Sequence, residues 1–227
     1  MPPLVTIVTP VLDDAEAAGK LLSQVPATPE VEIILVDGGH AADLERLVQT
    51  RHDTRLYRTQ PGRGRQMNAG AASAGGEWLL FLHADSQLPA GWLEAFHGLE
   101  HHIAGGWFRF ALDDTAWQAR IIERGVAWRV RQLKLPYGDQ GLFVRRRVFE
   151  SMGGFRELPL FEDVDLVRRL VRTGVVTELP LPLLTSSRRW RRDGWVRRSL
   201  RNGVLISLYW VGVPPAWLAR LYDGQRG

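Results

Sequence analysis

The chain has 227 residues, no cysteine and a formal net charge of +4 at pH 7. Its hydrophobic share of 45% and charged share of 24% are normal for a globular protein, which excludes a disordered chain. The absence of cysteine excludes disulfides, thiolate nucleophiles and cysteine metal sites. A chain of this length is expected to form one large α/β domain, residues 1–227, rather than two domains.

The chain ends carry no targeting pattern. After Met1 the chain enters an apolar run without a basic region or a small-residue cleavage site, so we expect no secretory signal. The late apolar stretch 204–213 is about half of the ~20 residues that a membrane-spanning helix needs. We therefore expect a cytoplasmic protein, either free or at the inner face of the membrane.

The first hundred residues alternate between strand-like and helix-like segments. The predicted strands are apolar runs rich in β-branched residues, as in strands buried on both faces. In chain order, strands are predicted at 4–9, 31–36, 55–58 and 78–82, and helices at 13–24, 41–50, 62–74 and 89–99. This alternation predicts a Rossmann-like, doubly wound and mostly parallel sheet.

The rest of the chain lacks this regular alternation. Strands are predicted at 105–112, 141–144 and 175–179, and helices at 117–133, 146–152 and 162–172. A basic segment and a Trp-rich tail follow, and we expect the tail to be helical. The sequence therefore predicts a mixed sheet in this half.

Acidic side chains follow three of the predicted strands, namely Asp13, Asp37 and Asp85. Ligands of open α/β sheets bind outside the carboxyl ends of the strands, so we expect these residues to share a site. Asp85 offers the hard oxygen ligand that Mg2+ or Mn2+ prefers; the alternative is a cap for the helix near Pro89. Asp37 can accept hydrogen bonds from a nucleobase or ribose; the alternative is a tight turn with Gly38.

A glycine-rich segment, residues 62–70, opens the third predicted helix. Backbone N–H groups, the helix dipole and the guanidinium groups of Arg63 and Arg65 at one end suit a diphosphate. The segment has neither the Walker spacing nor the dinucleotide fingerprint. The alternative is a close contact between helix and sheet, which explains the small residues 69–72 but neither arginine.

Acids cluster at the start of the helix predicted at 162–172. Glu162, Asp163 and Asp165 are more acids than one helix cap needs, so a general base is the alternative to capping. Asp139 lies in a Gly-Asp-Gln-Gly segment that is either a plain turn or a polar ligand contact.

The basic segment 186–194 contains Arg188 and Arg189. It could close over phosphates or bind an acidic surface, and a solvated basic face is the alternative. A nucleic-acid partner is not expected, because the arginines form one short run and no nucleic-acid-binding motif accompanies them.

Taken in order, these motifs resemble glycosyltransferase family 2, which has the GT-A fold. The resemblance covers roughly residues 4–195 and is carried by segments 5–14, 32–39, 64–70, 80–86 and 161–165. The variants Gly-Arg-x-x-Gln-Met-Asn-Ala-Gly, His-Ala-Asp, Gly-Asp-Gln-Gly and Ser-x-Arg-Arg-Trp are similar to a bacterial subgroup associated with radical-SAM and selenium-domain proteins.

The resemblance implies a metal-dependent, inverting transfer of a sugar from a nucleotide diphosphate donor, with a UDP-sugar favoured. Asp85 would hold Mn2+ or Mg2+, and Asp163, beside Glu162, would be the base. Residues 1–100 would bind the nucleotide, 101–194 the acceptor, and 195–227 would form a helical tail. The donor-binding set that it implies is Pro10, Val11, Asp13, Asp37, Gly38, Arg63, Arg65, Asn68, His83, Ala84, Asp139, Arg188 and Arg189.

One position departs from the family pattern. His83 replaces the first aspartate of the usual metal motif. A neutral histidine can still hydrogen-bond a ribose, but it would weaken metal binding if that position is a ligand.

Two other functions stay open. A nucleotidyltransferase would carry a glycine-rich, basic loop after the first strand, where this chain has residues 10–13, Pro-Val-Leu-Asp. A non-catalytic binding protein could share the scaffold. The acceptor is not identified, and the tail is expected to pack on the domain, form a homodimer contact or lie on a membrane surface as an amphipathic helix.

Overall fold

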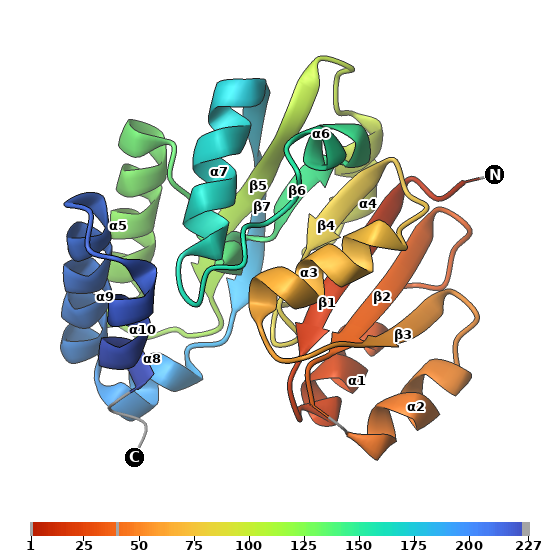
Figure 1. Cartoon of the computed structure of the whole chain (residues 1–227), viewed down its shortest axis with the longest axis horizontal. Coiled ribbons are helices and arrows are strands. Elements are labelled where there is room, and N and C mark those ends of the chain that lie inside the picture. Colours follow the sequence, from red (N-terminus) through yellow and green to blue (C-terminus); the bar gives the residue numbers. More distant parts are fainter. Residues whose placement is uncertain (1, 40, 224–227) are drawn as a thin grey trace.

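The computed structural model describes residues 2–39 and 41–223 (Figure 1). A seven-stranded sheet of order β3-β2-β1-β4-β6-β5-β7 runs through the molecule. Its first four strands are β1 (Val5–Val11), β2 (Val31–Asp37), β3 (Thr54–Arg58) and β4 (Trp78–Phe81). All neighbouring pairs among them are parallel, which confirms the sheet predicted for the first hundred residues.

The second half completes the sheet with mixed directions, as predicted. Its strands are β5 (Ile103–Leu112), β6 (Leu142–Arg145) and β7 (Val175–Thr185). Strand β6 is antiparallel to both β4 and β5, whereas β5 and β7 are parallel. All strands except β6 therefore point their carboxyl ends to the same edge of the sheet.

Helices cover both faces of the sheet and bury a separate apolar core on each. One core lies under α1 (Ala15–Gln24), α2 (Ala42–Gln49) and α4 (Trp92–His97). The other lies under α3 (Arg63–Ala72), α6 (Arg146–Ser151) and α7 (Glu162–Thr173). Alternate residues of β1 point into the two cores, because successive side chains of a strand face opposite ways.

The remaining helices gather at the far end of the molecule from β3 (Figure 1). They are α5 (Trp117–Leu133), α8 (Arg188–Asp193), α9 (Trp195–Trp210) and α10 (Pro215–Asp223), and a short 3-10 turn, η1 (Gly138–Gln140), precedes β6. The tail packs on the domain: Tyr209 lies against Phe161 with ring centroids 5.0 Å apart, and Leu205 and Leu218 are buried. Within residues 2–39 and 41–223, no helix combines the length and apolar composition needed to cross a bilayer.

Two predicted boundaries were wrong. Helix α4 begins at Trp92, not near Pro89, because Gly91 adopts a left-handed φ of 74° and ends the preceding loop. Strand β7 continues past Leu179 to Thr185, although it contains prolines. Proline is tolerated there because β7 is the edge strand of the sheet and needs no N–H toward solvent.

Helix α3 approaches the sheet closely through Gly70. A Cβ atom at Gly70 would lie 2.5 Å from Cγ1 of Val8 and 3.0 Å from Cγ2 of Val36. We expect Gly70→Ala to lower the free energy of unfolding by about 1–3 kcal/mol, because the packed core cannot absorb the methyl group. Denaturant unfolding measures this change.

Gly125→Ala is the matched control. Gly125 also lies inside a helix, α5, but a Cβ atom there would meet nothing within 4 Å. We expect this substitution to raise the free energy of unfolding by about 0.5–1 kcal/mol, through lower backbone entropy in the unfolded chain. Equal effects at the two glycines would show that close packing at Gly70 is not the reason for its small size.

Candidate active site

The ends of β1 and β2 are joined into one platform. Val11 pairs with Asp37 in the sheet register, and the backbone N–H of Gly38 donates to the Val11 carbonyl at 2.9 Å. The buried Gln66 side chain of α3 donates to the carbonyls of Val11 and Val36 at 2.8 and 2.7 Å. The start of α3 is therefore fixed over the carboxyl ends of both strands.

Asp13 and Asp37 lie together at this platform, as their positions after neighbouring strands predict. A Cβ atom at Gly39 would lie 2.2 Å from Oδ1 of Asp13. Asp37 is fully buried, and its Oδ1 accepts a 2.8 Å hydrogen bond from the Gly39 N–H, so the turn interpretation holds for that oxygen. Its Oδ2 is buried and accepts no hydrogen bond from a described residue, but it lies 3.9 Å from Nε of Arg58, at ion-pair distance.

The loop after β4 brings Asp85 to the meeting point of two cavities. The larger cavity, of about 280 Å³, lies beside the start of α1 and includes Ala84 and Arg188. The smaller, of about 170 Å³, lies under the C-terminal helices, and both are lined by Asp85 and Ser186. Because α4 begins at Trp92, Asp85 does not cap it, and the capping interpretation is wrong.

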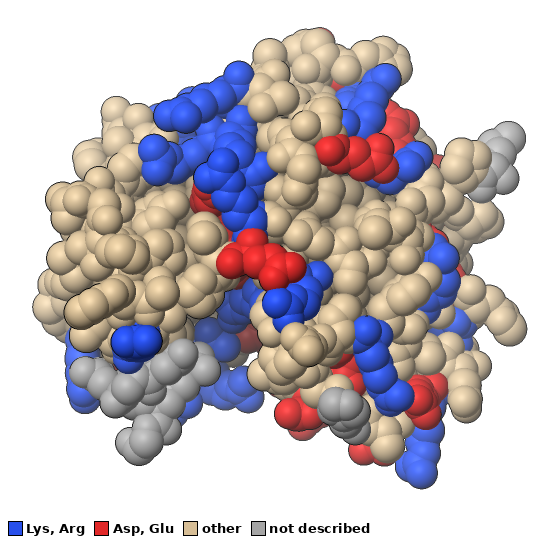
Figure 2. All heavy atoms as spheres, in the orientation of Figure 1, with Lys and Arg blue, Asp and Glu red and all other residues tan. Residues whose placement is uncertain are grey.

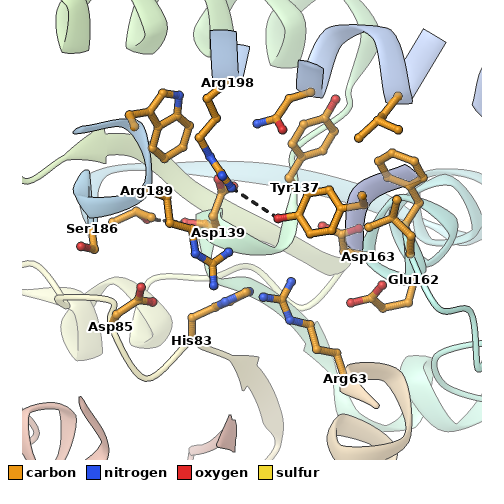
Figure 3. A pocket seen from close by; sticks show the side chains of 17 residues that line it. Arg63, His83, Asp85, Tyr137, Asp139, Glu162, Asp163, Ser186, Arg189 and Arg198 are labelled. Carbon is orange, nitrogen blue, oxygen red and sulfur yellow. Dashed lines mark hydrogen bonds between the residues drawn. The ribbon is translucent and has the colours of Figure 1, made fainter. Parts of the chain in front are cut away.

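The cavity under the C-terminal helices, here called the central cavity, collects side chains from distant parts of the sequence (Figure 3). Its ionisable and polar lining comes from α3, the loop after β4, η1, α7 and the tail helices. These residues are Arg63, His83, Asp85, Tyr137, Asp139, Glu162, Asp163, Thr185, Ser186, Arg189, Arg198, Asn202 and Tyr222.

Positive charge gathers on one part of the central cavity. Arg63 and Arg189 point toward the centre beside His83 (Figure 3), and neither arginine forms a hydrogen bond or ion pair with any described residue. Burial and the nearby Arg63 lower the pKa of Arg189. Burial, Arg63 and Arg189 lower the pKa of His83 to about 3, so its imidazole is neutral at pH 7. This part of the cavity is therefore built to receive an anion.

Ion pairs fix the positions of α8 and α9, the helices that carry Arg189 and Arg198. Arg191 binds Asp114 at the end of β5 through two hydrogen bonds of 2.6 and 2.9 Å, which keep the pKa of that carboxyl low. Arg198 binds Asp193 at 2.7 Å and lies over the Trp190 ring at 5.4 Å. The position of Arg189 thus depends on contacts between segments far apart in the sequence.

Negative charge gathers at the opposite part, at the start of α7. Oδ2 of Asp163 accepts a 2.6 Å hydrogen bond from the Gly138 N–H, which ties α7 to η1. Burial and the neighbouring Asp163 raise the pKa of Glu162 to about 7. Burial is also the main reason why the pKa of Asp139 rises to about 6. Asp165, in contrast, is paired with Arg169 at 2.8 Å and has a structural role.

Two predicted ligand residues point elsewhere. Arg65 binds Glu157 and Gln60, each at 2.7 Å, and does not line the central cavity. Residues two apart in a helix point about 200° apart, so only one of Arg63 and Arg65 can face it. The side-chain amide of Asn68 exchanges two 2.8 Å hydrogen bonds with the backbone of Phe155 and so holds α3 to the loop before α7.

The residues present fit a divalent ion that is shared with a ligand. Among the described residues, no three His, Asp or Glu side chains come together to form a complete metal cage. Asp85 is half-buried and lines the central cavity, so it can supply one carboxylate ligand. Mg2+ and Mn2+ sites often need only one or two carboxylates, because phosphate oxygens and waters complete the shell.

The tail provides a part of the cavity that its sequence did not indicate. Arg198, Asn202 and Tyr222 line it, although the tail was expected to pack on the domain, to associate or to lie on a membrane surface. Gln66 was also missed as the residue that fixes α3 to the strand ends. The sequence held a partial signal for Arg198, because an arginine on the inner side of an amphipathic helix needs a polar partner.

The glycosyl transferase family 2 model matches residues 6–153, more than half of the chain. The chain therefore belongs to glycosyltransferase family 2. The matched segment contains β1 to β6 and the loop of Asp85, but it ends before α7 and the tail helices. No curated protein sequence matches the chain.

Solved structures with a similar fold include two that contain a nucleotide or a nucleotide sugar. The mannosyltransferase PcManGT from Pyrobaculum calidifontis, in complex with GDP-Man and Mn2+, is 17% identical with a TM-score of 0.63, over 81% of this chain and 57% of that one. Staphylococcus aureus TarS 1-349, in complex with UDP, is 15% identical with a TM-score of 0.64, over 81% and 60%. The chain thus spans under two thirds of these structures, and the likeness establishes a GT-A-like fold.

The buried Glu162 predicts a specific dependence of stability on pH. Its pKa of about 7 lies above the ordinary value of 4.5, so the folded protein binds more protons than the unfolded chain between these values. This contribution to stability is therefore lost as the pH rises from about 4.5 through 7. The free energy of unfolding of Glu162→Gln, relative to that of the wild type, should therefore be about 1–3 kcal/mol higher at about pH 8 than at about pH 5.

Glu16→Gln, at an exposed glutamate of α1, is the control and should track the wild type at both pH values. His83 has a lowered pKa and contributes in the opposite sense, but it is present in all three proteins. A constant difference between Glu162→Gln and the wild type across this range would contradict the raised pKa of Glu162.

Proposed function

We propose that this chain catalyses the metal-dependent, inverting transfer of a sugar from a nucleotide diphosphate donor to an acceptor hydroxyl. The observation that carries the proposal is the pair of unpaired guanidinium groups, Arg63 and Arg189, in the cavity that Asp85 and Asp163 also line. Arg189 is half-buried, so its unpaired charge is costly unless a ligand supplies the opposite charge, whereas Arg63 is exposed to solvent at the mouth of the cavity. A diphosphate supplies that charge and accepts bidentate hydrogen bonds.

The donor would lie across both cavities. Each is small for a nucleotide sugar, but together they reach the range of about 300–1,000 Å³ that is usual for ligand pockets. The diphosphate would lie between Arg63 and Arg189, with the neutral His83 as a hydrogen-bond partner for phosphate or ribose. The nucleoside would extend toward Asp13 and Asp37, which line neither of these two cavities, and a base N–H would share Oδ2 of Asp37 with Arg58.

Asp85 would hold Mn2+ or Mg2+ together with the donor phosphates. The ion, when bound, acts as a Lewis acid that stabilises the leaving diphosphate. Arg63 and Arg189 add positive charge at the same leaving group, and their geometry is fixed before the donor binds. Such preorganised charge stabilises a transition state without the cost of reorienting water.

Asp163 would accept the proton of the acceptor hydroxyl. Its carboxylate lies across the central cavity from Asp85 (Figure 3), so base and leaving group would flank the anomeric carbon, as inversion requires. The Gly138 N–H donates to Oδ2 and the Val164 N–H donates to Oδ1, so the carboxylate is fixed while each oxygen keeps a second lone pair. Glu162 and Asp139, whose raised pKa values lie near neutrality, can carry protons beside it without adding full negative charge.

The donor and the subgroup are the open parts of the proposal. UDP-sugar remains the favoured donor, but the similar structures contain UDP-GlcNAc in one case and GDP-Man in the other. The resemblance to the subgroup associated with radical-SAM and selenium-domain proteins stays a prediction. A nucleotidyltransferase is disfavoured, since the loop after β1 contains no glycine or basic residue.

A thermal-shift screen of UDP, GDP and their sugars, with and without Mn2+, tests donor binding. We expect a metal-dependent rise in Tm with UDP or a UDP-sugar, because a ligand that binds only the folded protein stabilises it. Arg189→Gln should weaken this binding by about 10–100-fold, since it removes charged hydrogen bonds to the ligand. It should not lower the Tm of the ligand-free protein, because it also removes the repulsion by Arg63.

Arg147→Gln, at an exposed arginine of α6 outside the cavity, is the matched control and should bind the donor as the wild type does. Equal binding by Arg189→Gln and Arg147→Gln would contradict a phosphate site at Arg189. A response to none of the nucleotides would contradict the proposed function itself.

Asp163→Asn separates a transferase from a non-catalytic binding protein. The asparagine oxygen can keep the hydrogen bond from Gly138, its NH2 group then replaces the oxygen that accepts from the Val164 N–H, and the side chain cannot accept a proton at neutral pH. Donor binding should survive, while slow donor hydrolysis and sugar transfer fall by about 10²–10⁴-fold. Nucleotide release during incubation with the donor measures this, and an unchanged hydrolysis rate would show that Asp163 is not the base.

A further inference from the structure

Helix α5 is apolar on two opposite sides. Its inner side is buried at Ala119 and Val130 and packs on the domain. Its outer side exposes Trp117, Ile121 and Trp128, with 68%, 55% and 63% of their surfaces open. These three residues lie on one stripe, because a helix repeats about every 3.6 residues. Large apolar side chains in such a stripe indicate a contact surface rather than chance exposure.

The tail helices show the same arrangement. In α9, Arg198 and Leu205 are buried, whereas Val196, Leu200 and Val204, spaced four residues apart, are exposed. In α10, Leu218 is buried, and both Trp217 and Leu221 are exposed. Helices α5, α9 and α10 together form one end of the molecule (Figure 1). The outer helical surface is defined here as Trp117, Ile121, Trp128, Val196, Leu200, Val204, Trp217 and Leu221.

Helices α5 and α9 carry mostly positive charge. Helix α5 carries four arginines and one glutamate, and α9 carries three arginines and no acid. Arg124 and Arg131 lie on the exposed side of α5, next to Trp128 along the same stripe. Figure 2 shows that the surface over α9 and α10 is mostly uncharged, with basic groups and no acidic ones in view there.

We propose that the outer helical surface docks on a membrane that contains anionic lipids. Tryptophan side chains favour the boundary between acyl chains and headgroups, and arginines beside them meet anionic headgroups. A second copy of this chain is the less suitable occupant, because a symmetric contact would bring two copies of the same arginine-rich surface together. Positive charge beside exposed Trp, Val and Leu side chains instead complements an anionic, partly apolar surface.

The docked orientation would bring the central cavity close to the lipid surface. Helices α8, α9 and α10 line that cavity with Trp190, Arg198 and Tyr222 on their inner sides. The outer sides of α9 and α10 belong to the outer helical surface. One layer of helices would thus separate the membrane from the cavity.

Co-sedimentation with vesicles tests the proposal without any enzymatic assay. We expect the wild-type chain to sediment with phosphatidylcholine vesicles that contain about a quarter phosphatidylglycerol, and to sediment weakly with phosphatidylcholine alone. Trp117→Ala with Trp128→Ala should reduce binding about tenfold or more while the fold is kept, because both side chains are mostly exposed. Arg124→Gln with Arg131→Gln should reduce binding by a similar factor and lower its sensitivity to salt.

Arg46→Gln with Arg147→Gln is the charge-matched control, since these exposed arginines lie on α2 and α6. Val196→Ser with Leu200→Ser is a second apolar variant, placed on α9, and should also lose binding. Wild-type binding by both apolar variants, or no binding by the wild type, would overturn the proposal. So would a dimer in vesicle-free solution, measured by light scattering, that Trp117→Ala with Trp128→Ala turns into a monomer.

Discussion

The site depends on holding two like charges together. Arg63 and Arg189 both lower the pKa of His83, and Arg63 lowers that of Arg189, an effect that the nearby Asp85 offsets only in part. Their repulsion is balanced by contacts elsewhere, above all by Gln66 at the start of α3 and by the Asp114–Arg191 ion pair that fixes α8. The fold thus holds two positive charges close together, and an anionic ligand would reduce the repulsion between them.

The opposed charges of the central cavity suit a displacement reaction better than simple binding. A site that only held a diphosphate would need the arginines and Asp85, but not the acids across the cavity. Glu162 and Asp139 are buried with raised pKa values, which costs stability near neutral pH. Acids kept at such a cost beside Asp163 are typical of sites that move protons, since perturbed pKa values cluster where chemistry occurs.

The C-terminal helices join the two proposals. The family match ends at residue 153, before α7 to α10. Their inner sides complete the cavity, and the outer sides of α9 and α10 are apolar and basic. A buried ion pair, Arg198 with Asp193, links the two sides, because it fixes α9 against α8. Contacts at the outer helical surface would therefore involve α9 and α10, the same helices that line the central cavity on their inner sides.

The sequence by itself determined the parallel half of the sheet, since unbroken apolar runs and turn residues are local signals. It also determined that Asp13, Asp37 and Asp85 follow strands that end at one edge of the sheet, because parallel strands share a carboxyl end, although only Asp85 lines the central cavity. Only the tertiary structure decided that Arg63 rather than Arg65 faces the cavity and that Asp165 is structural. It alone placed Arg198 and Tyr222 in the same cavity as Asp163. Such contacts between residues distant in sequence depend on packing, which no local pattern encodes.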